Sequence, residues 1–280
     1  MRIAVDAPRR PALRYYGGKW KLAPWIISHF PEHQNYVEPC GGAASVLLQK
    51  PRSPLETYND LDGNVVNFFR VLRDQPDELI RKIRLTPWAR AEYELSLESS
   101  EDEVEGARRF YCAACMSFNG ATQFDGSTYG WRHTLDYNMR HSPALDMANN
   151  TLQAIADRLL GVQIEIRDYA DVIDRFDRPV CLIYFDPPYV AETRNKTFWY
   201  GHEFDEHDHA EAAALLRQCA GYVVVSGYAC PLYTELYEDH GWTRVDKEAQ
   251  TNSGGKRIES LWLSPRTVEA LQAPVQGVLL

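Results

Sequence analysis

The chain has 280 residues, of which 45% are hydrophobic and 25% are charged, and its formal net charge at pH 7 is −9. This balance is typical of a globular protein with a sizeable core, and it argues against a protein that coats nucleic acid through a strongly basic surface. No apolar run approaches the roughly 20 residues that a membrane helix needs, and residues 1–11 contain no apolar signal segment. We therefore expect a cytoplasmic protein without a membrane partner.

Two strand–helix units open the chain. Residues 36–38 are predicted to form a buried strand, which runs through a turn of small residues into a helix at 45–49. A second strand at 55–58 ends in Asn59-Asp60, and apolar residues at helical spacing predict a helix from about 62 to 73. A strand that ends in an acid about 20 positions after such a turn is typical of a nucleotide-binding α/β sheet.

This alternation stops between about residues 76 and 150. The stretch is rich in charged and aromatic residues, and it contains a loop punctuated by glycine at 119–130. We interpret it as an inserted, mostly helical subdomain. The predicted organisation is therefore a catalytic domain at 1–75 and 160–265, an inserted target-recognition subdomain at 76–159, and a tail at 266–280.

The α/β pattern resumes after the insert. Strands are predicted at 162–167, 180–185, 221–226, 243–247 and 257–263, and helices at 169–176, 205–220 and 231–240. Asp205 is expected to cap the second of these helices. The last two strands are expected to form a hairpin, which would put an antiparallel edge on an otherwise parallel sheet.

The strand at 180–185 leads into Asp186-Pro187-Pro188-Tyr189, at the kind of position where open α/β sheets bind ligands. Each proline fixes φ and removes an N–H donor, so the carbonyls around them are held rigidly. The Asp186 carboxylate and the Pro187 carbonyl would make a pair of acceptors for an amino group, and Tyr189 offers an aromatic face to a base. Taken alone, the segment could also be a proline turn with Asp186 as a cap.

In this setting the motif resembles the catalytic motif of methyltransferases that act on amino groups of DNA. The whole chain, from about Leu13 to Leu263, resembles the adenine methylases of the Dam type, in the motif order of their alpha group. The matching segments are Tyr15-Tyr16-Gly17-Gly18-Lys19, Val37 to Val46, Asn59-Asp60-Leu61-Asp62, Phe110-Tyr111 through Asn119-Gly120, and Ser253 to Glu259.

This resemblance implies a Rossmann-like sheet with an inserted DNA-recognition subdomain. It also implies a site-specific enzyme that transfers methyl from S-adenosylmethionine to N6 of a flipped-out adenine in double-stranded DNA, with a cognate restriction endonuclease as a candidate partner. The implied catalytic residues are Asp186, Pro187 and Tyr189. The implied cofactor-binding residues are Tyr15, Lys19, Glu38, Pro39, Cys40, Gly41, Gly42, Asp60, Asp168 and Asp186. The implied DNA-binding residues are Asn119, Gly120, Arg132, Arg194, Lys196, Lys256 and Arg257.

The residues of the cofactor loop fit this interpretation chemically. Small residues at Gly41 and Gly42 would let the backbone approach a ligand, and the loop lacks the spacing of a phosphate-binding loop, as suits a cofactor without phosphate. Asp60 is placed to accept hydrogen bonds from ribose hydroxyls, and it could also cap the next helix. Glu38 could contact the amino-acid part of the cofactor through water, or orient the Lys19 ammonium.

The chain departs from the family pattern at Cys40, which replaces an aromatic residue, at Ala44, which replaces a glycine, and at Tyr15, which replaces a tryptophan. The alternatives are a cytosine-N4 methyltransferase, in which serine usually replaces Asp186, a protein-glutamine methyltransferase, in which asparagine does, and a weakened relative that only binds DNA. Cys40, in the cofactor loop, is not expected to be the nucleophile of a cytosine-C5 enzyme.

No metal site is predicted. Cys112 and Cys115 lie in an apolar stretch, where buried free thiols on a helix are favoured because no second Cys-x-x-Cys pair exists for zinc. The group of His202, His207 and His209 is interpreted as the solvated start of a helix whose acidic residues favour the helix dipole.

Overall fold

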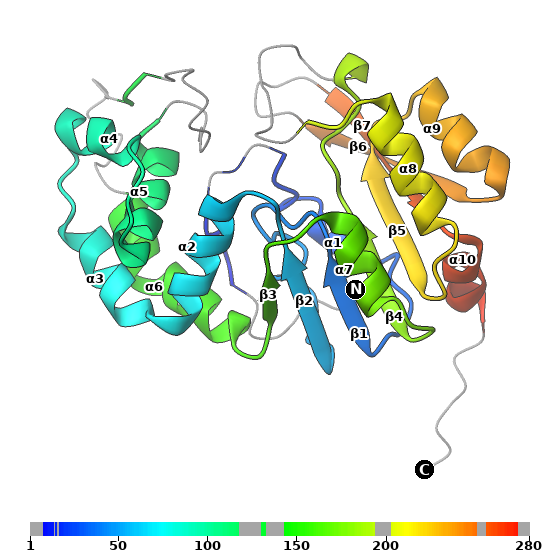
Figure 1. Ribbon diagram of the computed structural model, residues 1–280, viewed down its shortest axis with the longest axis horizontal. Helices are drawn as coiled ribbons and strands as arrows, with labels where there is room; N and C mark the ends of the chain where they lie inside the picture. The colour runs from blue at the N-terminus through cyan, green and yellow to red at the C-terminus, as the bar shows by residue number, and fades with distance from the viewer. Residues whose placement is uncertain are drawn as a thin grey trace. The chain divides into compact units, whose positions relative to one another are not determined.

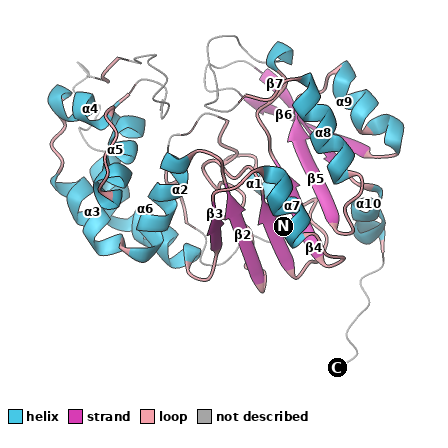
Figure 2. Cartoon of the chain, viewed as in Figure 1, coloured by secondary structure: helices cyan, strands magenta, loops and turns pink. Residues whose placement is uncertain are grey.

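The computed structural model describes residues 8–13, 15, 17–117, 130–132, 143–193, 203–250 and 256–273. Within these residues the chain forms one mixed seven-stranded sheet with helices (Figure 2), and its strands are hydrogen-bonded in the order β3-β2-β1-β4-β5-β7-β6. This arrangement confirms the predicted Rossmann-like α/β fold. The strands are β1 (Asn35–Glu38), β2 (Leu55–Asn59), β3 (Gln163–Glu165), β4 (Cys181–Phe185), β5 (Tyr222–Gly227), β6 (Thr243–Gln250) and β7 (Lys256–Leu263).

The direction of the strands changes across the sheet. β1 pairs with β4 and β4 with β5, both in parallel, whereas β7 pairs antiparallel with β5 and with β6. The predicted hairpin at the end of the chain is therefore confirmed, and it places the antiparallel strand β7 between β5 and the edge strand β6.

The chain divides into two compact units. The first, called the helical unit, comprises Met1–Pro24, Gly41–Arg52 and Tyr58–Arg167. The second, called the motif unit, comprises Trp25–Cys40, Ser53–Thr57 and Asp168–Leu280. The short helix α1 (Ala23–Ile27) lies where the chain passes from one to the other. The domain boundaries drawn at 76 and 159 stay a prediction.

The motif unit is built on the buried strands β4 and β5. All five residues of β4 are buried, as expected for a central parallel strand that reads as a continuous apolar run. Its core combines apolar residues of the strands with those of α7 (Tyr169–Phe176), α8 (Glu206–Leu216) and α9 (Pro231–Leu236). In Figure 1, α7 and α8 lie in front of these strands. Asp205 caps α8 in a capping box, which confirms the predicted cap.

The helical unit contains α2 (Gly63–Asp74), α3 (Pro76–Leu85), α4 (Arg90–Ser96), α5 (Glu103–Met116) and α6 (Pro143–Leu159). α5 packs against α2, α3 and α4, while α6 packs against α2 and α3. The described part of 76–159 is therefore mostly helical, as predicted. Cys112 and Cys115 are buried free thiols on α5, which also confirms the expectation for them.

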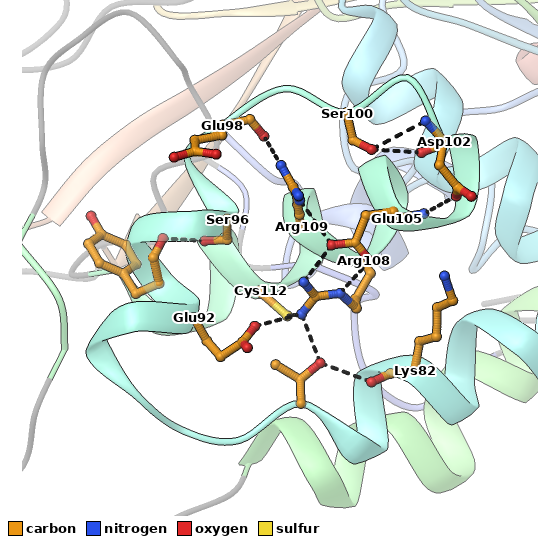
Figure 3. A network of polar contacts seen from close by, with 12 residues as sticks. Lys82, Glu92, Ser96, Glu98, Ser100, Asp102, Glu105, Arg108, Arg109 and Cys112 are labelled. Atoms are coloured by element: carbon orange, nitrogen blue, oxygen red, sulfur yellow. Dashed lines mark hydrogen bonds and ion pairs between the residues drawn. The ribbon is translucent and has the colours of Figure 1, made fainter.

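A polar network joins three helices of this unit around Arg108 (Figure 3). The Arg108 guanidinium donates from Nε and Nη2 to the two carboxylate oxygens of Glu105, at 2.8 and 2.6 Å. From Nη1 it donates to Glu92 at 3.0 Å and to the Thr86 hydroxyl at 2.9 Å. Because these bonds reach α4 and the end of α3, they fix the packing of both helices on α5.

Three predicted elements differ in the structure. Residues 45–49 form turns rather than a helix, and the helix from Pro231 ends at Leu236, before the short 3₁₀ helix Glu238–His240. The predicted tail begins instead as the helix α10 (Pro265–Gln272), because Ser264 caps its N-terminus and Pro265 occupies its first turn. None of the described helices is both long and apolar enough to cross a bilayer.

Candidate active site

The predicted catalytic motif follows β4, next to the end of β1. The two strands run parallel, with Val37 opposite Ile183, so Glu38 and Asp186 both emerge at the same edge of the sheet. In the strand order, β1 has β2 and then β3 on one side, and β4 and then β5 on the other, so successive strands are added in opposite directions from β1. This is a topological switch point, and α/β sheets bind ligands outside the carboxyl ends of the strands at such a point.

The Asp186 carboxylate is half-buried and is held from the neighbouring strand β5. Ser226 donates from Oγ to Asp186 Oδ1 at 2.9 Å, and its hydroxyl also lies 2.8 Å from the Tyr184 hydroxyl. Burial, followed by the charge of Asp186, raises the pKa of Tyr184 well above its ordinary value, so this phenol stays protonated. The carboxylate thus accepts from the Ser226 hydroxyl, which in turn lies beside the neutral hydroxyl of Tyr184.

Tyr189 is buried, and its hydroxyl donates to Glu259 Oε2 on β7 at 3.1 Å. The Tyr228 ring meets the Tyr189 ring edge-on, with centroids 4.7 Å apart. The Arg257 guanidinium lies over the ring of Tyr228 and donates to its hydroxyl at 3.2 Å. Burial, then the charges of Asp186 and Glu259, raise the pKa of Tyr189 well above its ordinary value. The ring therefore stays a neutral phenol.

Glu38, at the end of β1, is buried and accepts a hydrogen bond from the Tyr36 hydroxyl on its own strand. Burial, and next the charge of Glu38, raise the pKa of Tyr36 well above its ordinary value, which keeps the donor protonated. Pro39 is buried, and Cys40 packs partly buried against the core of the motif unit. The cofactor-binding roles predicted for Glu38, Pro39 and Cys40 stay predictions.

In the helical unit, Asp60 organises the glycine loop. Its carboxylate accepts from the backbone N–H of Gly42 at 2.7 Å and of Asp62 at 2.9 Å. Burial raises its pKa to about 6, although the backbone N–H donors act in the opposite direction. The cap of α2 is Asp62 rather than Asp60, because Asp62 accepts from the N–H of Asn64. Asp60 is therefore bound to the loop and does not cap the helix.

Packing gives a different reason for the two glycines than the one predicted from the sequence. A Cβ at Gly41 would lie 2.3 Å from the Tyr58 ring, and a Cβ at Gly42 would lie 3.1 Å from the Tyr15 ring. Gly42 also has φ of +47°, which glycine adopts without strain. The tyrosine rings therefore already require small residues here, whatever approaches the loop. That Gly41 and Gly42 contact a cofactor stays a prediction.

The residues after the glycines show two further features. Ala44, which replaces the family's glycine, has φ of +53° and is fully buried, so this position retains the left-handed backbone that suits glycine. Ser45 is buried, and its hydroxyl has no hydrogen-bond partner among the described residues. A buried hydroxyl in this state is uncommon in proteins and is compatible with a ligand group as its partner.

Other predicted site residues lie as follows. Lys19 is buried, and its ammonium donates to the Gly17 carbonyl at 2.8 Å; Tyr15 packs against Gly42. Asp168 is exposed and caps α7 by accepting from the Ala170 N–H at 2.8 Å. This bond gives Asp168 a structural role, and its cofactor-binding role stays a prediction.

Most of the predicted DNA-binding residues lie outside the described residues, namely Asn119, Gly120, Arg194 and Lys196. Lys256 begins β7, and its side chain is not described. Arg132 follows the bridge between Ser117 and Trp131, and its N–H donates to the Met116 carbonyl at 2.6 Å. Arg257 is the one DNA-binding candidate that the described side chains place close to the catalytic motif, through Tyr228.

Sequence reasoning missed Ser226, Tyr184 and Tyr228 as members of this site, whereas Glu259 belongs to the matching segment from Ser253 to Glu259. The available signal was the two-residue period of the strands, which puts Tyr184 and Asp186 on one side of β4. His209 was also misinterpreted, because it is buried on α8, where its Nδ1 lies 3.2 Å from the Tyr233 hydroxyl. Among the described residues, no group of three or more His, Cys, Asp or Glu side chains is arranged to hold a metal ion.

The strand order, the switch point and the Asp-Pro-Pro-Tyr motif after β4 are those expected of the methyltransferase class that the sequence resembles. A family model described as D12 class N6 adenine-specific DNA methyltransferase matches residues 15–252. The chain belongs to this family, and it is an adenine-specific DNA methyltransferase.

Several relatives are similar to this chain over about nine tenths of its length. A type II methyltransferase of Lactococcus lactis, M1.LlaDCHI, is 28% identical over 274 residues, which cover 89% of this chain and 93% of that protein. The DNA adenine methylase of Escherichia coli K12 is 25% identical over 267 residues, covering 90% and 94%. The type II methyltransferase M.MjaIII of Methanocaldococcus jannaschii is 22% identical, covering 90% and 96%.

Proposed function

We propose that the protein transfers the methyl group of S-adenosylmethionine to N6 of an adenine flipped out of duplex DNA. The observation that carries this proposal is the Asp186 carboxylate, which follows β4 at the switch point of the sheet and is fixed there by Ser226. An adenine inside a duplex cannot reach such a site, so the base must leave the stack at a cost of a few kcal/mol.

The residues of the glycine loop fit this cofactor. Asp60 is an acidic acceptor after β2, where ribose hydroxyls are bound in sheets of this kind. Ser45 has a buried hydroxyl without a partner among the described residues, and Lys19 supplies a buried cation suited to a carboxylate. When bound, S-adenosylmethionine supplies a methyl group activated by a positively charged sulfonium. Asp60, Gly42 and Lys19 are the residues that would hold it.

On the substrate side, the Asp186 carboxylate and the Pro187 carbonyl would accept hydrogen bonds from the two N6 hydrogens of adenine. This orients the nitrogen lone pair and stabilises the positive charge that develops on N6. Tyr189 would stack on the base. Transfer would then be a direct displacement in which positioning supplies most of the acceleration. The bond from N6 to the methyl carbon would form as the bond from that carbon to sulfur breaks, S-adenosylhomocysteine would leave, and the N6 proton would pass to water.

The test measures which base is modified. Purified protein, unmethylated duplex DNA and isotopically labelled S-adenosylmethionine are incubated, and the nucleosides are identified by mass spectrometry. Label in N6-methyladenine supports the proposal, while label in N4-methylcytosine or none in DNA contradicts it. The Asp186→Ala variant is expected to lose methylation. Asp246→Ala, which removes a carboxylate of β6 bonded to Ser260, is the matched control and is expected to keep it.

The relatives named type II methyltransferases also favour a role beside a restriction endonuclease. We expect the protein to methylate one short sequence nearly completely and so protect the DNA of its host. Single-molecule sequencing of DNA from an expressing host reports the site and the extent of its modification. Sparse methylation scattered over many sequences would contradict this role.

A further inference from the structure

Three hydroxyl and carboxylate groups form a chain that leads into the catalytic motif. Tyr184 Oη lies 2.8 Å from Ser226 Oγ, and Ser226 Oγ lies 2.9 Å from Asp186 Oδ1. Tyr184 is 3% and Ser226 is 2% exposed, so solvent does not compete for either hydroxyl. In a buried setting of this kind each hydrogen bond is electrostatically stronger than in water, and bonds in series polarise one another.

The sheet explains why these residues meet. β4 and β5 are parallel, with Tyr184 opposite Val224 and Phe185 opposite Val225. Phe185 and Val225 belong to the apolar core on one side of the sheet. Because side chains alternate along a strand, the residues before and after them project to the other side. Tyr184, Asp186 and Ser226 therefore lie together by register, although Ser226 follows Asp186 by 40 residues.

The direction of the hydrogen bonds follows from the chemistry of the three groups. Ser226 donates from Oγ to Asp186 Oδ1, and a hydroxyl has a single proton to give. The Ser226 oxygen then accepts, and the proton in the second bond comes from Tyr184. Burial raises the pKa of Tyr184 well above its ordinary value, which keeps this donor protonated at neutral pH. The chain therefore runs from Tyr184 through Ser226 to Asp186.

We propose that Ser226 is a positioning residue for methyl transfer, which holds the Asp186 carboxylate in the orientation that accepts the N6 hydrogen, and that Tyr184 acts through Ser226. This inference rests on the proposed role of Asp186. Nothing in it requires Ser226 or Tyr184 to touch the adenine or the cofactor. In Ser226→Ala the carboxylate loses this hydrogen bond, its rotation about the Cβ–Cγ bond is less restrained, and the acceptor is out of place for part of the time.

Single substitutions separate positioning from binding. In Ser226→Ala, kcat is expected to fall about 10- to 100-fold, the scale of a small misplacement of a reacting group. The Kd values for S-adenosylmethionine and for DNA are expected to stay within about 2-fold, because Ser226 donates to the acceptor and not to a ligand. Tyr184→Phe keeps the Ser226–Asp186 bond, and its kcat is expected to fall by only about 3-fold.

The double variant tests whether Tyr184 acts through Ser226. If it does, Tyr184→Phe has no further effect on kcat once Ser226 is alanine, so the double variant equals Ser226→Ala. Two independent structural defects would instead multiply. Ser226→Thr keeps the hydroxyl and is expected to restore most of kcat, whereas Ser226→Cys keeps the volume but offers a weak donor and is expected to stay low.

Ser260→Ala is the matched control. Ser260 is 1% exposed on β7 and pairs with Gly227, the residue after Ser226. Its hydroxyl also donates to an aspartate, Asp246, at 2.7 Å, but this aspartate is on β6. Ser226→Ala and Ser260→Ala therefore each lose one buried serine–aspartate hydrogen bond, but only Ser226→Ala loses a bond to Asp186. The kcat of Ser260→Ala is expected to be unchanged.

The outcomes distinguish this inference from the function on which it rests. If Asp186→Ala keeps wild-type turnover, the proposed role of Asp186 is wrong. If Asp186→Ala is inactive but Ser226→Ala keeps wild-type kcat, only the positioning role is wrong. Should Ser226→Ala fail to fold, Ser226→Cys and Tyr184→Phe carry the test, and wild-type kcat in both would overturn the inference.

Discussion

Tyr189 donates a hydrogen bond to Glu259 at 3.1 Å across 70 residues of sequence, so the aromatic residue of the catalytic motif is tied to strand β7. The edge-on ring of Tyr228 adds a second constraint. Two contacts of different kinds therefore fix both the position and the tilt of the Tyr189 ring. If Tyr189 stacks on the target base as proposed, little ordering of its ring is left to do on binding.

Substitutions at Tyr189 are expected to separate the ring from its hydroxyl. Tyr189→Ala removes a stacking surface that contributes about 1–3 kcal/mol per base, so binding of the flipped target base is expected to weaken about 5- to 150-fold. Tyr189→Phe keeps the ring and should weaken it by only a few-fold. Fluorescence of 2-aminopurine at the target position reports how much of the base is flipped.

Tyr222→Ala serves as the control for that series. Tyr222 begins β5, at the opposite end of the strand from Ser226, and the Arg266 guanidinium lies over its ring at 5.3 Å. Its removal is expected to leave base flipping unchanged. Equal loss of the fluorescence signal in the Tyr189→Ala and Tyr222→Ala variants would show that the effect comes from general destabilisation.

Asp60 is expected to make cofactor binding depend on pH. Burial raises its pKa to about 6, so the carboxyl takes up a proton as the pH falls below 6. A protonated carboxyl accepts hydrogen bonds less well, and the affinity for S-adenosylmethionine should therefore fall between pH 7 and 5. Calorimetric titration at several pH values measures this change. An affinity that is constant over this range would contradict the proposed role of Asp60.

The same carboxyl should have the opposite effect on folding. A pKa of about 6 in the folded protein, against an ordinary value of 3.8, means that the folded state binds the proton more tightly. The contribution of Asp60 to the free energy of unfolding is then fully present below about pH 4 and is lost as the pH rises through 6. At neutral pH the folded protein without cofactor therefore buries the ionised Asp60 carboxylate, and its free energy of unfolding is lower than at pH 4 by the contribution of this group.

The two alanines of the glycine loop allow a direct test of backbone strain. Both are buried, but only Ala44 has a positive φ. Ala43→Gly loses a buried methyl group and gains chain entropy in the unfolded state, and it is expected to lower the free energy of unfolding by about 1–2 kcal/mol. In Ala44→Gly, relief of about 1–2 kcal/mol of left-handed strain offsets this loss. Urea unfolding should therefore show a near-neutral Ala44→Gly.

The sequence predicts local features of this protein well and distant pairings poorly. The Asp186 motif, the hairpin at 243–263 and the Asp205 cap all depend on residues that are close together in the chain. The Ser226–Asp186 bond depends on the register between β4 and β5, which cannot be predicted from any local sequence pattern. The packing that requires glycine at position 41 could not be predicted for the same reason, because the Tyr58 ring that it contacts belongs to the next strand.

The Arg108 network gives a prediction for stability at acid pH. Hydrogen bonds from Arg108 and Arg109, together with their charges, lower the pKa of Glu105 to about 2 from an ordinary 4.5, in spite of some desolvation. A lowered pKa means that the stability from Glu105 is present above about pH 4.5 and is lost as the pH falls through 2. Glu105→Gln is therefore expected to lower the free energy of unfolding at pH 7 by about 1–3 kcal/mol, and by less at pH 3.

Glu94→Gln is the control for that comparison, since Glu94 lies exposed on the neighbouring helix α4. It is expected to change the free energy of unfolding by no more than about 0.5 kcal/mol at either pH. Urea unfolding at pH 7 and pH 3 measures both variants. If Glu105→Gln is as neutral as Glu94→Gln at pH 7, the bonds around Arg108 do not stabilise the packing of α3, α4 and α5.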